Sequence, residues 1–141
     1  MNVYILGRQP ELGVAELESL YGSSHVRPVG DKFAVVDVPV DFDRLGGSMK
    51  SAKILDTIHG SHPKNDFKRI SEILPKLINS YPSEGKIKLG VSVYGFEMSA
   101  YKIGGEALRL KKTLRNLKRS VRVVPNENPA LSSAQTYHNQ L

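Results

Sequence analysis

Any chemistry in this chain would have to start from a few histidines, serines and acids. His59 and His62 lie three residues apart and Asp56 precedes them, a spacing that metal ions can use. The surrounding segment HGSHPKN, however, has the glycine and proline of a linker, so the spacing does not place the three side chains on one helical face. We therefore interpret these histidines as solvated linker residues and predict no metal site.

The other polar side chains form no catalytic set. Ser132 and Ser133 lack the Gly-x-Ser-x-Gly turn around a serine nucleophile, and the sequence identifies no partner for His25 or His138. Two Gly-Gly pairs complete neither the Gly-x-Gly-x-x-Gly dinucleotide fingerprint nor a Walker loop. We assign no catalytic and no cofactor-binding residue, because the sequence contains no complete active site.

One tetrapeptide, Asn-Pro-Ala-Leu at 128–131, approaches the Asn/Asp-Pro-Pro-aromatic motif with which amino-group methyltransferases hold a target nitrogen. That motif requires a second proline and a stacking aromatic ring, and Ala130 and Leu131 occupy these positions instead. We interpret the segment as a turn that leads into a helix.

The strongest signal in the sequence is electrostatic. The net charge is +6 and the pI is about 9.6. Between Lys102 and Arg122, eight basic residues accompany a single acid, Glu106, so this segment carries +7 and the rest of the chain −1. A basic face on one element is typical of a protein that binds a phosphate backbone, although a solvated helix face carries the same pattern.

The candidate RNA-binding residues are basic side chains of this segment and one outward-facing tyrosine. They are Lys111, Lys112, Arg115, Lys118, Arg119, Arg122 and Tyr94. Only Tyr94, Phe96 and Tyr101 are aromatic residues near the basic segment, whereas single-stranded RNA is usually read by stacking on such rings. The sequence therefore favours recognition of the shape and phosphates of a folded RNA.

The composition of the chain limits the kinds of protein that it can be. A chain of 141 residues with 40% hydrophobic and 24% charged residues suits one globular domain or two very small ones. There are no cysteines, which removes disulfides and thiolate sites and fits a cytoplasmic protein. The chain has no apolar run of about 18 residues, and its N-terminus lacks the basic region and cleavage site of a signal peptide, so no membrane association is expected.

The first half of the chain predicts a mixed unit of strands and one helix. Pro10 suits the first turn of that helix and Gly22 its end, while Gly30 and Asp31 favour a hairpin between two strands. The predicted elements are a strand at 3–6, a helix at 10–21, strands at 25–29 and 32–38, and a strand at 53–58.

The second half shows a more regular pattern. Asn65 is predicted to cap a helix that Pro75 should kink or split. A later helix is predicted from Ser99 to Arg119, and because Gly104 and Gly105 weaken its first turns, a start nearer Glu106 is the alternative. The buried stripe of that later helix is predicted to be Ile103, Ala107, Leu110, Leu114 and Leu117. The other predicted elements are an alternating strand at 86–95, a short strand at 121–124 and a helix from about 131. Helices alternating with strands indicate an α+β or mixed α/β fold.

Several phrases, in order, resemble the N-terminal half of one methylase family, the THUMP-type tRNA guanine-N2 methyltransferases and their RNA or DNA methylase relatives. The phrases are YILGRQPELGVAELESLYG at 4–22, RLGGSMKSAKILDTI at 44–58, KIKLGVSVYG at 86–95 and SVRVVPNENPALSSAQTYHNQL at 120–141. Together they extend over nearly the whole chain.

The resemblance implies a ferredoxin-like piece at 1–60 and a THUMP-like domain at 61–141 that grips folded tRNA. In the family a Rossmann-type domain follows, which binds S-adenosylmethionine and carries the Asn/Asp-Pro-Pro-aromatic motif. This sequence has no such domain, so the resemblance implies a truncated chain whose partners are tRNA and the missing catalytic domain. Two alternatives stay open, namely a basic protein-interaction module and the N-terminal region of a DNA methylase.

Overall fold

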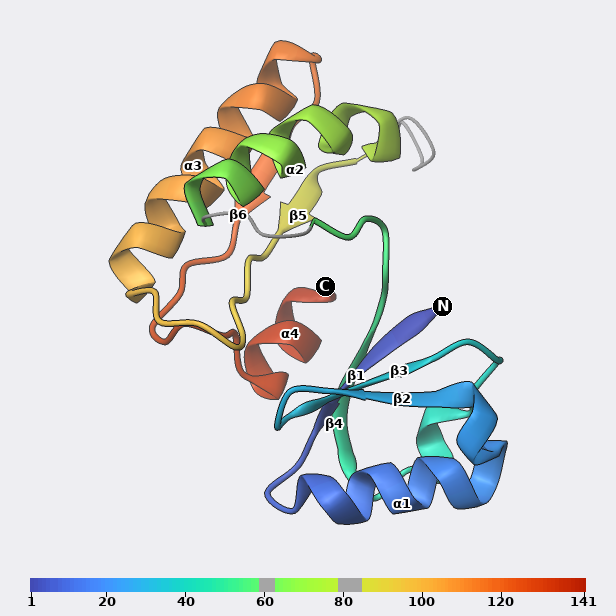
Figure 1. The fold of residues 1–141 in the computed structure, drawn as a ribbon. Helices are drawn as coiled ribbons and strands as arrows, with labels where there is room; N and C mark the ends of the chain where they lie inside the picture. The colour runs from blue at the N-terminus through green and yellow to red at the C-terminus, as the bar shows by residue number, and fades with distance from the viewer. Residues whose placement is uncertain (59–62, 79–84) are drawn as a thin grey trace. The chain divides into compact units, whose positions relative to one another are not determined.

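The computed structural model describes residues 1–58, 63–78 and 85–141, which divide into two compact units, Met1–Thr57 and Ile58–Leu141 (Figure 1). Within the described residues the fold is mixed α+β, with four α-helices, a four-stranded antiparallel sheet in the first unit and a two-stranded parallel sheet in the second. The α+β prediction is confirmed at this level. The predicted boundary between residues 60 and 61 lies outside the described residues.

The first unit is an antiparallel sheet with one helix against it (Figure 1). Its elements are β1 (Asn2–Leu6), α1 (Pro10–Tyr21), β2 (Val26–Val29), β3 (Phe33–Val36) and β4 (Ser48–Lys53), with 3-10 turns at Ser23–His25 and Phe42–Arg44. The strand order is β2-β3-β1-β4. Tyr4 and Leu6 of β1 and Leu17 of α1 are almost fully buried in the core between sheet and helix.

Glycines set the ends of the elements in this unit. Pro10 is in the first turn of α1, and Gly22 ends the helix with a φ of 92°, which a side chain would disfavour. Gly30, with a φ of 55°, turns the chain between β2 and β3, whose register pairs Val29 with Phe33. The predicted helix and hairpin are therefore confirmed.

A polar contact joins α1 to the loop before β4. The backbone N–H groups of Gly46 and Gly47 donate to the two carboxylate oxygens of Glu16 at 2.8 and 2.9 Å. The helix and the loop approach so closely that a Cβ on Gly47 would lie 2.6 Å from the Cα of Gly13. The Gly-Gly pair is therefore explained by close packing of backbone on backbone.

Two predictions for this unit are wrong. The fourth strand is Ser48–Lys53 rather than 53–58, because β4 is held by backbone pairing with β1 at the edge of the sheet and its side chains are largely polar and exposed. His25 also has a partner, since its Nδ1 lies 2.8 Å from Oδ1 of Asp37.

The second unit contains two parallel strands connected by a helix. Its elements are α2 (Pro63–Ile78), β5 (Ile87–Leu89), α3 (Ala100–Asn116), β6 (Val121–Val123) and α4 (Ser133–Asn139). Helix α3 is the crossover between β5 and β6, whose register pairs Ile87 with Val121. Ile78 of α2, Leu114 of α3 and Val121 of β6 share one core cluster, so the two long helices and the sheet pack together (Figure 1).

Helix α2 begins before its predicted cap, whereas helix α3 begins at the start predicted for it and ends earlier. Asn65 lies inside α2, and Pro75 does not split that helix, which continues to Ile78. Helix α3 spans Ala100–Asn116 and Lys102 N donates a hydrogen bond to the Ser99 side chain, so the predicted start at Ser99 is confirmed and the alternative start near Glu106 is wrong. Ser99 capping and burial of the next turn outweigh the low helix propensity of two glycines, whereas the helix ends three residues before the predicted Arg119.

The stripe predicted for α3 is buried only in part. Ile103, Ala107, Leu110 and Leu114 are buried, whereas Leu117 is the C-terminal capping residue and is 43% exposed. The predicted alternation at 86–95 is visible in burial, although the paired strand spans only Ile87–Leu89.

The last helix, α4, is held at its N-terminal end by a capping box and by the buried Leu131 before it. Ser132 and Gln135 form a reciprocal capping box, with hydrogen bonds of 3.1 and 2.9 Å. Leu131, just before it, is buried against Gly90, where a Cβ would approach a Leu131 methyl group to 2.6 Å. Within the described residues, no helix has the length and hydropathy needed to cross a bilayer.

Candidate nucleic-acid interface

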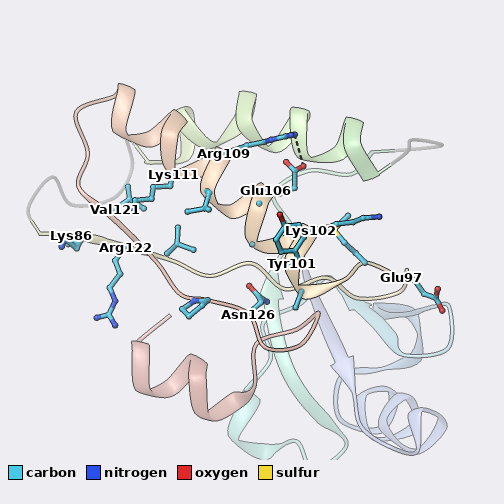
Figure 2. Close-up of a pocket in the computed structure, with 17 residues that line it drawn as sticks. Lys86, Glu97, Tyr101, Lys102, Glu106, Arg109, Lys111, Val121, Arg122 and Asn126 are labelled. Carbon is cyan, nitrogen blue, oxygen red and sulfur yellow. Dashed lines mark hydrogen bonds and ion pairs between the residues drawn. The ribbon is translucent and has the colours of Figure 1, made fainter.

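An open cleft of about 1280 Å³ runs along α3 in the second unit (Figure 2). One wall is α3 from Ala100 to Lys111, and the opposite wall is formed by β6 with Pro125 and Asn126 after it. Lys86, which immediately precedes β5, also lines it. The cleft therefore depends on the parallel pairing of β5 with β6, which brings residues far apart in sequence to one place.

The face of α3 turned to the cleft follows helical spacing. Tyr101, Gly104, Gly105, Leu108 and Lys111 recur at intervals of three and four residues and all line the cleft. The core face of the same helix is formed by the four buried residues described above. The two glycines thus leave a short stretch of this wall without side chains, between Lys102 and Glu106, which also line the cleft.

The cleft has an excess of positive charge. Its ionisable lining residues are Lys86, Glu97, Lys102, Glu106, Arg109, Lys111 and Arg122, five basic and two acidic. In Figure 2 the basic side chains of Lys86, Lys111 and Arg122 lie towards one end, and the carboxylate of Glu97 lies at the other. An extended anion would therefore be attracted to the first end.

One acid inside this region is paired. Oε1 of Glu106 accepts a hydrogen bond from Nη1 of Arg109 at 3.0 Å, drawn as a dashed line in Figure 2. The Glu106 side chain is 19% exposed, whereas that of Arg109 is 77% exposed. The carboxylate therefore offsets part of the charge that Arg109 could present to an anion.

A second, smaller groove of about 530 Å³ continues along the same helix. It is lined by Leu108, Lys111, Lys112, Arg115 and Asn116, two of which, Leu108 and Lys111, also line the larger cleft. The cationic surface therefore extends from the cleft to the C-terminal turn of α3.

The candidate residues divide among these surfaces. Lys111 lines both, Lys112 and Arg115 line the groove, and Arg122 lines the cleft. Lys118 and Arg119 line neither, because α3 ends at Asn116 and the chain turns away with a positive φ at Lys118.

Tyr94 also lines neither surface and is half-buried. The aromatic side chain in the cleft is that of Tyr101, which is 91% exposed. Sequence reasoning did not select this residue, nor Lys86, Lys102 and Arg109. The spacing of Tyr101, Gly104 and Leu108 on one helical face is the signal that could have found the first of these.

Of the histidines and serines considered in the sequence, those that the structure describes line neither the cleft nor the groove. In the part of the chain that the structure describes, no group of three or more histidines or acids could hold a metal ion, and His59 and His62 lie outside it. Ser132, whose surroundings lack the turn of a serine nucleophile, is the N-cap of α4.

Comparison with known proteins adds no identification. No protein-family model matches the chain, and no curated protein or solved structure shows significant similarity to it. The structure by itself defines an α+β protein of two units with a cationic cleft in the second unit.

Proposed function

We propose that this chain is the tRNA-binding N-terminal region of an S-adenosylmethionine-dependent RNA methyltransferase. The observation that carries the proposal is the cleft along α3, which has five basic and two acidic side chains in its lining and continues into the groove at Lys112 and Arg115. A surface of this charge and length suits the phosphates of a folded RNA.

The distribution of charge between the two units supports the same proposal. Residues 58–141 hold fourteen basic and six acidic side chains, a net charge of +8. Residues 1–57 hold six basic and eight acidic side chains, a net charge of −2. An RNA would therefore be attracted to the second unit and not to the first.

The topology of each unit is compatible with the domains that the family resemblance implies. The order β2-β3-β1-β4 is that of a ferredoxin-like sheet, with the short 3-10 turn at Phe42–Arg44 in place of the second helix. In the second unit, β5, α3 and β6 form a strand-helix-strand unit, which we propose as the core of the THUMP-like domain. In this proposal the second unit holds the tRNA, and a separate domain binds S-adenosylmethionine and methylates a guanosine.

The test is a binding titration with a tRNA transcript at several salt concentrations. The triple variant Lys111→Ala, Lys112→Ala and Arg115→Ala is expected to bind more weakly. The log–log slope of affinity against salt should fall by about one unit for each phosphate that the variant no longer neutralises.

A matched control removes the same charge elsewhere. Arg27→Ala, Lys32→Ala and Lys53→Ala together delete three exposed basic side chains from the first unit, and this variant should keep the wild-type affinity and slope. Equally weakened binding by both triple variants would show that only total charge matters. No saturable tRNA binding by the wild-type chain would refute the proposal and favour docking of an acidic protein partner.

A further inference from the structure

Gly104 and Gly105, in the second turn of α3, are not required by any packing contact among the described residues. A Cβ built on either glycine would meet no heavy atom within 4 Å. Neither residue has a positive φ, so the helical backbone there accepts any L-residue. Since glycine destabilises a helix interior relative to alanine, the pair weakens α3 without any compensating contact in the part of the chain that the structure describes.

Gly13, the glycine inside helix α1 of the first unit, does have a packing contact that explains it. A Cβ on Gly13 of α1 would lie 3.0 Å from the carbonyl oxygen of Gly47 and 3.1 Å from a methyl group of Leu6. That glycine is required because the loop before β4 packs directly on the helix. By the same reasoning, the bare surface at Gly104 and Gly105 suits a partner that lies directly on α3.

The surroundings of the two glycines indicate what kind of partner this is. Tyr101 and Leu108, one turn away on each side, are 91% and 58% exposed and stand beside the bare helix surface in the same cleft. The cations Lys86, Lys111 and Arg122 lie towards one end of that cleft (Figure 2). A ligand with a compact uncharged part and an anionic end fits this arrangement, whereas an apolar helix would leave the cations unpaired.

We propose that one nucleotide of the bound RNA lies directly on α3, with its sugar against Gly104 and Gly105 and its phosphate at Lys86, Lys111 and Arg122. This inference rests on the proposed RNA-binding function. Here the absence of side chains at 104 and 105 defines the floor of the subsite, and any added side chain would displace the sugar.

The test compares variants of the full chain that should all fold at least as well as the wild type. Gly105→Ala and Gly105→Gln should raise the melting temperature by about 4 °C, since both residues favour helix. The same variants are expected to weaken binding of a tRNA transcript by about threefold and about tenfold, respectively. Thr113→Ala is the control, because it also raises helix propensity in α3 but lies outside both the cleft and the groove.

The outcomes separate the inference from the function on which it rests. Stabilised Gly105 variants with weakened binding, together with a Thr113→Ala variant that binds normally, would support the subsite. If the wild-type chain binds the transcript and Gly105→Gln binds it equally well, the proposed subsite is wrong, while the proposed RNA-binding function still stands. A wild-type chain that does not bind the transcript would overturn both proposals.

Discussion

Glu106 is a negative charge on the helix that carries three of the five basic residues of the cleft. Its carboxylate pairs with Arg109 at 3.0 Å and lines the same cleft as Lys111 and Arg122. In the proposed function this carboxylate would repel a phosphate and hold the Arg109 guanidinium away from it. We therefore expect this residue to lower the affinity for RNA in the proposed function.

The substitution Glu106→Gln should therefore strengthen tRNA binding. Removing one negative charge and releasing Arg109 are expected to lower the dissociation constant for tRNA about threefold at low salt, and less at high salt. The measurement is a titration at two salt concentrations. Glu127→Gln, which removes an exposed acid outside the cleft and the groove, should have a smaller effect. Weaker binding by Glu106→Gln would contradict this account of the cleft.

At the scale of elements, the first unit depends on close approach between α1 and the loop before β4. A Cβ on Gly47 would lie 2.6 Å from the Cα of Gly13, so backbone would have to move to admit it. A Cβ on the neighbouring Gly46 would lie 3.6 Å from its nearest atom, which is ordinary contact. Two adjacent glycines thus differ sharply in what they tolerate.

This difference predicts opposite outcomes for two similar variants. Gly47→Ala should destabilise the first unit by about 1–3 kcal/mol, because the helix and the loop must separate. Gly46→Ala should change its stability little, since its N–H still donates to Glu16. Native-state hydrogen exchange of the amides in α1 and β1 measures the effect on this unit by itself. Equal protection in the two variants would show that the loop adjusts freely.

Elements with a strong side-chain pattern were predictable from the sequence. Helix α1 is defined by the apolar spacing around Leu17, by the proline in its first turn and by the glycine at its C-terminal end. Strand β5 is located by the alternation of Ile87 and Leu89 with polar residues. Edge strand β4 was not predictable, because its SMKSAK sequence lacks that alternation and its backbone pairs with β1. The apolar residues at 54, 55 and 58 gave a stronger local signal for a strand than β4 itself.

The candidate site was predictable only as far as it lies on one helix. Charge counting along the chain identified Lys111, Lys112 and Arg115, which share the groove on α3. The contribution of Lys86 depends on the pairing of β5 with β6, a long-range contact that local sequence does not encode. The end of α3 at Asn116 likewise removes Lys118 from the helical face, and its position required the structure.

At the scale of the whole molecule, charge is divided between two units of opposite sign, +8 and −2. Long-range attraction brings a polyanion to the positive unit, whereas like charge disfavours lasting contact with the other. At 0.15 M salt the screening length is about 8 Å, so only cations close to the phosphates contribute to affinity. The chain should therefore hold RNA through its second unit, while the first unit makes no stable contact with it.

Hydrogen exchange of the intact chain with and without a tRNA transcript tests this division. Bound tRNA is expected to slow exchange of amides at the N-terminal turns of α3, in β6 and around Asn126, where the cleft lies. Amides in β1 to β4 should exchange at the same rate in both samples. The protection should vanish at about 0.5 M salt, because phosphate contacts weaken as log affinity falls linearly with log salt concentration. Protection of the four-stranded sheet at low salt would mean that RNA contacts the acidic unit, and the assignment of binding to the second unit would then be wrong.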